Sequence, residues 1–217
     1  MDATTQPRVK GAKEGEVERV YRLIKDWLIH CKLPPGECLS EVELARQCQT
    51  SRTPIREACS RLAQDGWISR VRHKGYIVKP VSIRDLLQIY EYRKMLECFA
   101  VEKATQIGTA EQLDALAGII GIEQQPGADV RDIVSASDRF HLAIAEIAGN
   151  QRVINQLKLT LEYVHRLDIL STQQDGSWIP HGEILNAMQC RKSSEAQKMM
   201  AQHIECARDR MLRLFAT

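Results

Sequence analysis

Hydrophobic residues recur at steps of three and four along most of the chain, a spacing typical of amphipathic helices. The first such stretch covers residues 15–30 and stops before a Pro-Pro-Gly turn. A second, short helix is predicted to open at Ser40, with Glu43 three residues later completing a capping box. A third begins around residues 51–53, with a proline in its first turn. The pattern therefore predicts three helices in quick succession.

The period then changes from that of a helix to that of a strand. Residues 68–72 and 76–79 form two short β-like runs around His73-Lys74-Gly75, which predicts a hairpin with basic residues at its tip. Helix, helix, tight turn, helix and basic hairpin is the order of a winged helix-turn-helix, in which one helix enters the major groove of DNA.

From Ser82 onward the sequence shows helical spacing and no further strand pattern. Six helices are predicted, at residues 82–107, 110–124, 129–148, 150–173, 178–190 and 193–215. The predicted fold class is mainly α, with an N-terminal winged helix-turn-helix followed by an all-α helical bundle. We expect a flexible N-terminus at 1–14, a DNA-binding domain at 15–80 and a helical domain at 81–217.

Composition and charge narrow the class. The chain has 217 residues, of which 44% are hydrophobic and 27% charged, as is usual for a soluble globular protein. It has no apolar run of membrane-spanning length and no apolar signal core, so we expect a cytoplasmic protein without a membrane partner. The seven cysteines include no C-x-x-C pair, which excludes a zinc ribbon and a thioredoxin motif. Residues 1–80 carry 15 Lys/Arg against 10 Asp/Glu, and residues 81–217 carry 15 against 18, which favours a polyanion-binding head.

The exposed face of the third helix carries the candidate DNA contacts. Arginine can bond guanine through two hydrogen bonds, and serine and threonine hydroxyls suit phosphates. The glycine and lysine at the hairpin tip would let backbone and charge approach a groove. An ordinary three-helix fragment with solvated arginines is the alternative. The candidates are Ser51, Arg52, Thr53, Arg56, Lys74 and Gly75.

The stretch LSEVELARQCQTSRTPIREACSRLAQDGWISRVRHKGYIV resembles the DNA-binding domain of the GntR family of bacterial transcription regulators. The resemblance spans residues 15 to 80. It implies that Arg52 and Arg56 read or clamp an operator, with Ser51 and Thr53 assisting. It also implies that Gly75 enters the minor groove. Where relatives often carry a DNA-facing arginine in the preceding helix, this chain has Val42.

Three histidines in the helical part fall on buried stripes of three different predicted helices: His141, His181 and His203. Several buried imidazoles need a partner for every ring nitrogen, and a metal ion supplies one shared partner. Neutral imidazole suits Zn, Ni, Fe or Mn. Separate hydrogen-bonded core histidines are one alternative. Another is a metal-dependent enzyme with a histidine-lined active site, although the chain lacks H-E-x-x-H, G-x-S-x-G and a phosphate-cradling glycine loop.

The runs SDRFHLAIAEIAGN, HGEILNAMQ and MMAQHI are similar to the FCD ligand-binding domain of the FadR-type branch, an antiparallel helical bundle. The six predicted helices resemble the variant named after VanR. The resemblance implies that His141, His181 and His203 hold a divalent metal together with an aspartate. The usual aspartate position is Ser137, and the nearest carboxylate is Asp138. The fourth ligand is therefore left open between Asp138, a water or ligand oxygen, and none.

Arg93 lies on a buried stripe of the first body helix, where a salt bridge to Glu97 four residues later is the simpler interpretation. The run YRKMLE resembles the R-x-x-L-E run of the family, which implies that Arg93 faces a small carboxylate effector. His165 either lines the same cavity or is plain core. The expected partners are therefore a carboxylate effector, a second copy of the chain, and a palindromic double-stranded operator in the nucleoid.

Overall fold

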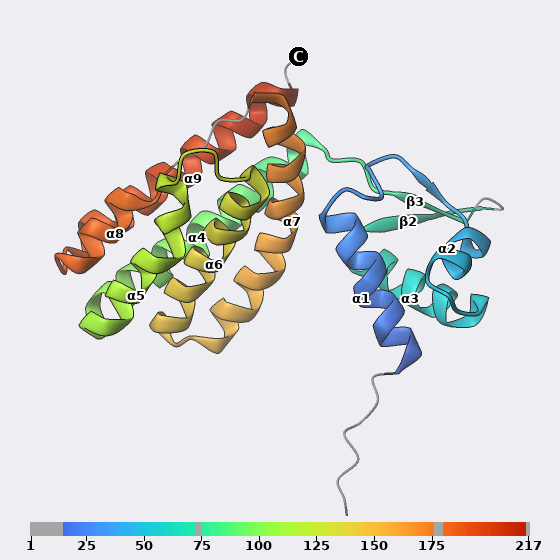
Figure 1. Cartoon of the computed structure of the whole chain (residues 1–217), viewed down its shortest axis with the longest axis horizontal. Coiled ribbons are helices and arrows are strands. Elements are labelled where there is room, and N and C mark those ends of the chain that lie inside the picture. Colours follow the sequence, from blue (N-terminus) through green and yellow to red (C-terminus); the bar gives the residue numbers. More distant parts are fainter. Residues whose placement is uncertain (1–14, 73–74, 176–179, 216–217) are drawn as a thin grey trace, which may run out of the picture. The chain divides into compact units, whose positions relative to one another are not determined.

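The computed structural model describes residues 15–72, 75–175 and 180–215, so the expectation for residues 1–14 lies outside it. The chain folds into two compact units whose main division falls between Lys79 and Pro80 (Figure 1). Among the described residues, no helix combines the length and the apolar character that crossing a lipid bilayer requires.

The first unit is the predicted winged helix-turn-helix. In the described part of this unit, the short strands β1 (Cys38–Leu39), β2 (Ile68–Val71) and β3 (Gly75–Val78) form an antiparallel sheet in the order β1-β3-β2. The strand β1 was not predicted, because two residues are too few to show an alternating pattern. The elements in chain order are α1 (Glu16–Ile29), β1 (Cys38–Leu39), α2 (Glu41–Gln47), α3 (Arg52–Gln64), β2 (Ile68–Val71) and β3 (Gly75–Val78).

Buried aliphatic residues hold these elements together. Ile24 of α1, Ile55 and Leu62 of α3 and Val78 of β3 are fully buried. The predicted capping box at α2 is wrong, since Ser40 makes no side-chain cap hydrogen bond. Its intended partner Glu43 instead accepts hydrogen bonds from Arg46 and Gln47. Helix α2 still begins after Ser40, whose backbone is extended.

The second unit is the predicted helical bundle. Helix α4 (Ile83–Ile107) packs against α6 (Val130–Ala148), α7 (Gln151–Asp175) and α9 (Ser193–Phe215). The buried side of α4 includes Tyr90 and Ala100. The predicted helix at 110–124 is an α-helix followed by one 3₁₀ turn, and the helix predicted at 178–190 begins only after His181. The elements are α4 (Ile83–Ile107), α5 (Ala110–Ile120), η1 (Gly121–Gln124), α6 (Val130–Ala148), α7 (Gln151–Asp175), α8 (Gly182–Gln189) and α9 (Ser193–Phe215).

Candidate functional site

The N-terminal half of α3 presents the predicted polar face. Its apolar positions, Ile55 and Ala58 among them, are buried against the rest of the unit. Because helical residues three and four apart share a face, the polar positions between them point outward. The exposed candidates are Ser51, Arg52, Thr53 and Arg56.

The two arginines of this face converge on one carboxylate. Arg52 Nη2 donates to Glu41 Oε2 at 3.2 Å, and Arg56 Nη2 donates to the same oxygen at 3.0 Å. Arg56 Nε also donates to Glu41 Oε1 at 3.3 Å. The hydrogen bond from Arg56, assisted by that from Arg52, lowers the pKa of Glu41 despite partial burial. The carboxylate is therefore ionised at neutral pH.

These side chains line a groove of about 460 Å³ together with Ser40, Val42, Arg70, Val71 and Gly75. Three arginines face a single carboxylate among the described lining residues, so the groove carries a net positive charge. Arg70 was not among the predicted contacts, because it lies in β2 and no helical stripe marks it. Glu41 was not predicted either, because its role depends on a contact between separate helices.

Gly75 has a structural reason to be glycine. Its φ is +89°, and a Cβ atom added there would lie 2.4 Å from the carbonyl oxygen of Leu39. A side chain would therefore push the β1–β3 pair apart. Entry of Gly75 into a minor groove stays a prediction, and Lys74 lies outside the described residues.

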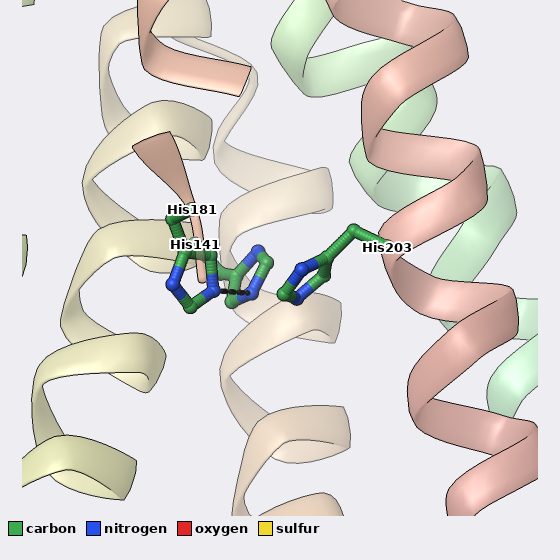
Figure 2. Close-up of side chains that lie close together, drawn as sticks. All are labelled: His141, His181 and His203. Atoms are coloured by element: carbon green, nitrogen blue, oxygen red, sulfur yellow. Dashed lines mark hydrogen bonds between the residues drawn. The ribbon is translucent and has the colours of Figure 1, made fainter. Parts of the chain in front are cut away.

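In the helical unit, the structure brings His141, His181 and His203 together (Figure 2). All three are buried, and each offers a ring nitrogen within 4.8 Å of the others. His141 comes from α6, His203 comes from α9, and His181 immediately precedes α8. The Nε2 atoms of His141 and His181 lie 3.0 Å apart.

Carboxylates behind two of the rings fix their orientation. Nδ1 of His141 pairs with Glu97 of α4, and Nδ1 of His181 pairs with Glu123 of η1. Glu123 also accepts a hydrogen bond from the backbone nitrogen of His181 at 3.1 Å. A carboxylate on Nδ1 leaves Nε2 as the nitrogen that would bind a shared ion, an arrangement common around metal-ligating histidines. No sequence pattern pointed to Glu123.

Two imidazoles of the cluster, those of His141 and His203, are held in the neutral form. Burial lowers the pKa of His141 to about 4, although Glu97 acts in the opposite direction. Burial, with the neighbouring His181 and His141, also holds the pKa of His203 well below its usual value. Metal ligation requires the neutral ring. Nδ1 of His203 is buried and has no hydrogen-bond partner among the described residues. Three converging nitrogens and one unsatisfied ring therefore fit a metal ion.

Of the two candidates for the fourth ligand position, Ser137 contacts the histidine cluster and Asp138 contacts His165 instead. Ser137 Oγ is 3.3 Å from Nε2 of His181, the same nitrogen that lies next to Nε2 of His141. The carboxylate of Asp138 pairs with Nδ1 of His165 at 2.5 Å and is not among the residues that converge. Asp138 as a metal ligand stays a prediction, and the structure gives this carboxylate a different immediate partner.

Arg93 is buried and donates through Nε to Glu97 Oε1 at 2.5 Å. Burial opposes ionisation of Glu97, but Arg93 and His141 outweigh it and lower its pKa to about 2. Glu97 thus links Arg93 directly to the histidine cluster. The hydroxyl of Tyr90, on the same helix, is buried without a hydrogen-bond partner among the described residues. The salt bridge expected from the sequence is present, and it engages Nε rather than the terminal nitrogens of Arg93.

Comparison with known families places both units. The family described as "FCD domain" matches residues 88–205, and the family described as "Bacterial regulatory proteins, gntR family" matches residues 16–78. The first match alone spans more than half of the chain.

Individual relatives agree with these matches. The Nta operon transcriptional regulator of Aminobacter aminovorans is 27% identical over 183 residues, covering 83% of this chain and 87% of the relative. The HTH-type transcriptional repressor RspR of Escherichia coli K12 is 28% identical over 196 residues, covering 87% and 85%. The solved structure of E. coli McbR/YncC is 20% identical and superposes with a TM-score of 0.78 over 94% of this chain and 100% of that chain. At that identity, the last likeness establishes the fold alone.

Proposed function

Because the chain belongs to the GntR family of bacterial transcription regulators, in the branch with an FCD domain, we propose that a small organic acid controls its binding to an operator. Since it is a regulator and not an enzyme, the interpretation of the histidine cluster as an active site is wrong. The protein would act in the cytoplasm on nucleoid DNA. Its six α-helices after Pro80, counted over the described residues, favour the VanR-like variant.

The observation that carries the DNA-binding proposal is the exposed pair Arg52 and Arg56 at the start of α3, beside the wing. Such a helix end reaches base edges in the major groove, with Ser51 and Thr53 placed for phosphates. Selection of bound duplexes from a random-sequence library tests this proposal. We expect enrichment of a palindrome with half-sites about one turn (~34 Å) apart. Recovery of unrelated sequences would contradict it.

A palindromic operator is bound by a protein with two-fold symmetry, so we expect a homodimer. An exposed apolar face of α4 supports such a dimer. Tyr92, Met95 and Phe99 lie on one side of this helix and are 38%, 70% and 45% exposed. Side chains at three- and four-residue steps form a continuous stripe. A two-fold axis would bring this stripe against the same stripe of a second copy and remove it from water. We propose α4 as a part of the homodimer interface.

We propose that His141, His181 and His203 hold a divalent metal, with Zn, Ni, Fe and Mn as candidates. When bound, such an ion would offer an open coordination position to a carboxylate oxygen of the effector. The three histidines would then tie α6, the start of α8 and α9 to one point. Ser137, Asp138 or the effector itself would complete the coordination.

We further propose that Arg93 binds the effector carboxylate, with His165 as a second contact. Arg93 donates to Glu97 through Nε, so Nη1 and Nη2 of Arg93 remain outside that hydrogen bond. A guanidinium can hold a carboxylate through two parallel hydrogen bonds. The Arg93 guanidinium lies 5.8 Å from the centre of the Tyr90 ring. The Tyr90 hydroxyl is buried without a hydrogen-bond partner among the described residues, which supports a polar ligand binding close to Arg93.

Arg93→Lys should weaken effector binding about tenfold, because an ammonium keeps the charge beside Glu97 but cannot form the planar fork. The measurement is the concentration at which a small carboxylate raises the melting temperature of each protein. Arg84→Lys, an exposed arginine on the same helix, is the control. If Arg93→Lys responds at the wild-type concentration, another residue holds the ligand, and His165 becomes the first candidate.

A further inference from the structure

Building on the proposed function, we propose that Glu41 positions Arg52 and Arg56 for reading bases and thereby raises discrimination between the operator and other DNA. The carboxylate itself lies at the first residue of α2, whereas both arginines lie on α3. It is thus a positioning residue that acts through the two arginines.

The contacts leave the reading atoms of both arginines available. Arg52 meets Glu41 through Nη2 alone, and Arg56 meets it through Nε and Nη2. Each guanidinium therefore keeps donors outside the pair. The side chains of Arg52 and Arg56 remain 60% and 59% exposed. A long exposed arginine normally loses rotamer freedom when it binds DNA, which costs conformational entropy. Because Glu41 already restricts both arginines in the free protein, less entropy is lost on binding.

The Glu41 carboxylate is itself held in a fixed position. The Glu41 side chain is only 14% exposed, in contrast to the arginines that it contacts. Just before it, Leu39 of β1 pairs with Tyr76 of β3, and the Leu39 carbonyl sits where Gly75 leaves room for it. The wing therefore fixes the backbone that carries Glu41. A carboxylate fixed in this way can set the direction of both guanidinium groups.

The negative charge has a second effect. Phosphates attract Arg52 and Arg56 on DNA of any sequence, and this attraction dominates non-specific binding. Glu41 competes with phosphates for the same nitrogens and repels the backbone. On the operator, base contacts to the correctly aimed arginines outweigh this repulsion. The carboxylate therefore penalises non-specific complexes more than the specific one.

The chain offers a matched control on the same helix. Glu43 is two residues from Glu41 and is 47% exposed. It pairs with Arg46 at 2.6 Å and with Gln47 at 2.9 Å, not with the arginines of α3. Glu43→Gln removes the same charge from the same short helix without touching Arg52 or Arg56.

The experiment compares wild type, Glu41→Gln and Glu43→Gln by fluorescence anisotropy. The probes are a duplex selected by the wild-type protein and a scrambled duplex of equal length and composition. Glu41→Gln should lose about tenfold in affinity for the selected duplex, since the aim of two bidentate contacts is relaxed. It should gain severalfold for the scrambled duplex, with a salt dependence steeper by about one unit of slope. Glu43→Gln should have a smaller effect both on the ratio of the affinities for the two duplexes and on the slope of the salt dependence.

Three outcomes would overturn the inference. Equal losses on both duplexes would assign Glu41 a purely structural role, and equal gains would make it a simple competitor for the arginines. Unchanged affinity for both duplexes would remove its role altogether. Each of these leaves the proposed function standing, provided that the wild-type protein prefers the selected duplex. If the wild type itself binds both duplexes equally, the proposed function fails as well.

Discussion

Replacement of His181 by alanine is expected to reduce the divalent metal content of the purified protein from about one ion per chain to almost none. His181 contributes one of three nitrogens that lie within 4.8 Å of one another, and a site with two imidazoles binds far more weakly. His203→Ala should have the same effect. The measurement is metal analysis of protein purified without a histidine tag or chelator, with circular dichroism to confirm that the helical unit survives.

The matched control is His165→Ala. His165 lies in the same bundle but is not one of the three converging histidines, so its loss should leave about one ion per chain. Metal-free wild-type protein would contradict the site and would indicate that Ser137 at the usual aspartate position abolishes binding. In that case Ser137→Asp should restore it, because Ser137 already lies 3.3 Å from Nε2 of His181.

Arg52→Ala and Arg56→Ala should each cost about 1–3 kcal/mol of operator binding, or roughly 5- to 150-fold in affinity, if they make base contacts. Both side chains are exposed at the start of α3 and line the groove beside the wing. The measurement is the dissociation constant for the selected duplex at one salt concentration.

Arg61→Ala is the control for this series. Arg61 also lies on α3 but pairs with Glu18 of α1 at 2.7 Å, outside the groove. Its loss should change operator affinity much less. Full operator affinity in both Arg52→Ala and Arg56→Ala would refute the assignment of α3 as the reading helix.

Much of the fold could be predicted because its elements bury long periodic stripes. Helices α4, α6, α7 and α9 each repeat their apolar residues over several turns, so period and breaks mark them. Strand β1 escaped because it has two residues and is defined by its partner β3. The capping box at Ser40 failed because Glu43 finds Arg46 and Gln47 instead, a competition that a motif does not reveal.

The site residues also fall into those that a sequence pattern indicates and those that only tertiary contacts reveal. A helical stripe shows that His141 and His203 face inward, but only tertiary packing decides that they meet His181. Glu97 had a visible signal, its four-residue distance from Arg93, whereas its contact with His141 crosses from α4 to α6. Glu123 and Glu41 had none, since each acts on residues far away in the sequence.

Control of DNA binding by the helical unit is tested most directly by the affinity of the metal-loaded protein for the selected duplex, measured with and without a small carboxylate that raises its melting temperature. Such a carboxylate should change operator affinity by about 5- to 150-fold, the usual range of coupling between two sites. A carboxylate that binds the protein and leaves operator affinity unchanged would contradict the claim that the helical unit controls the DNA-binding unit.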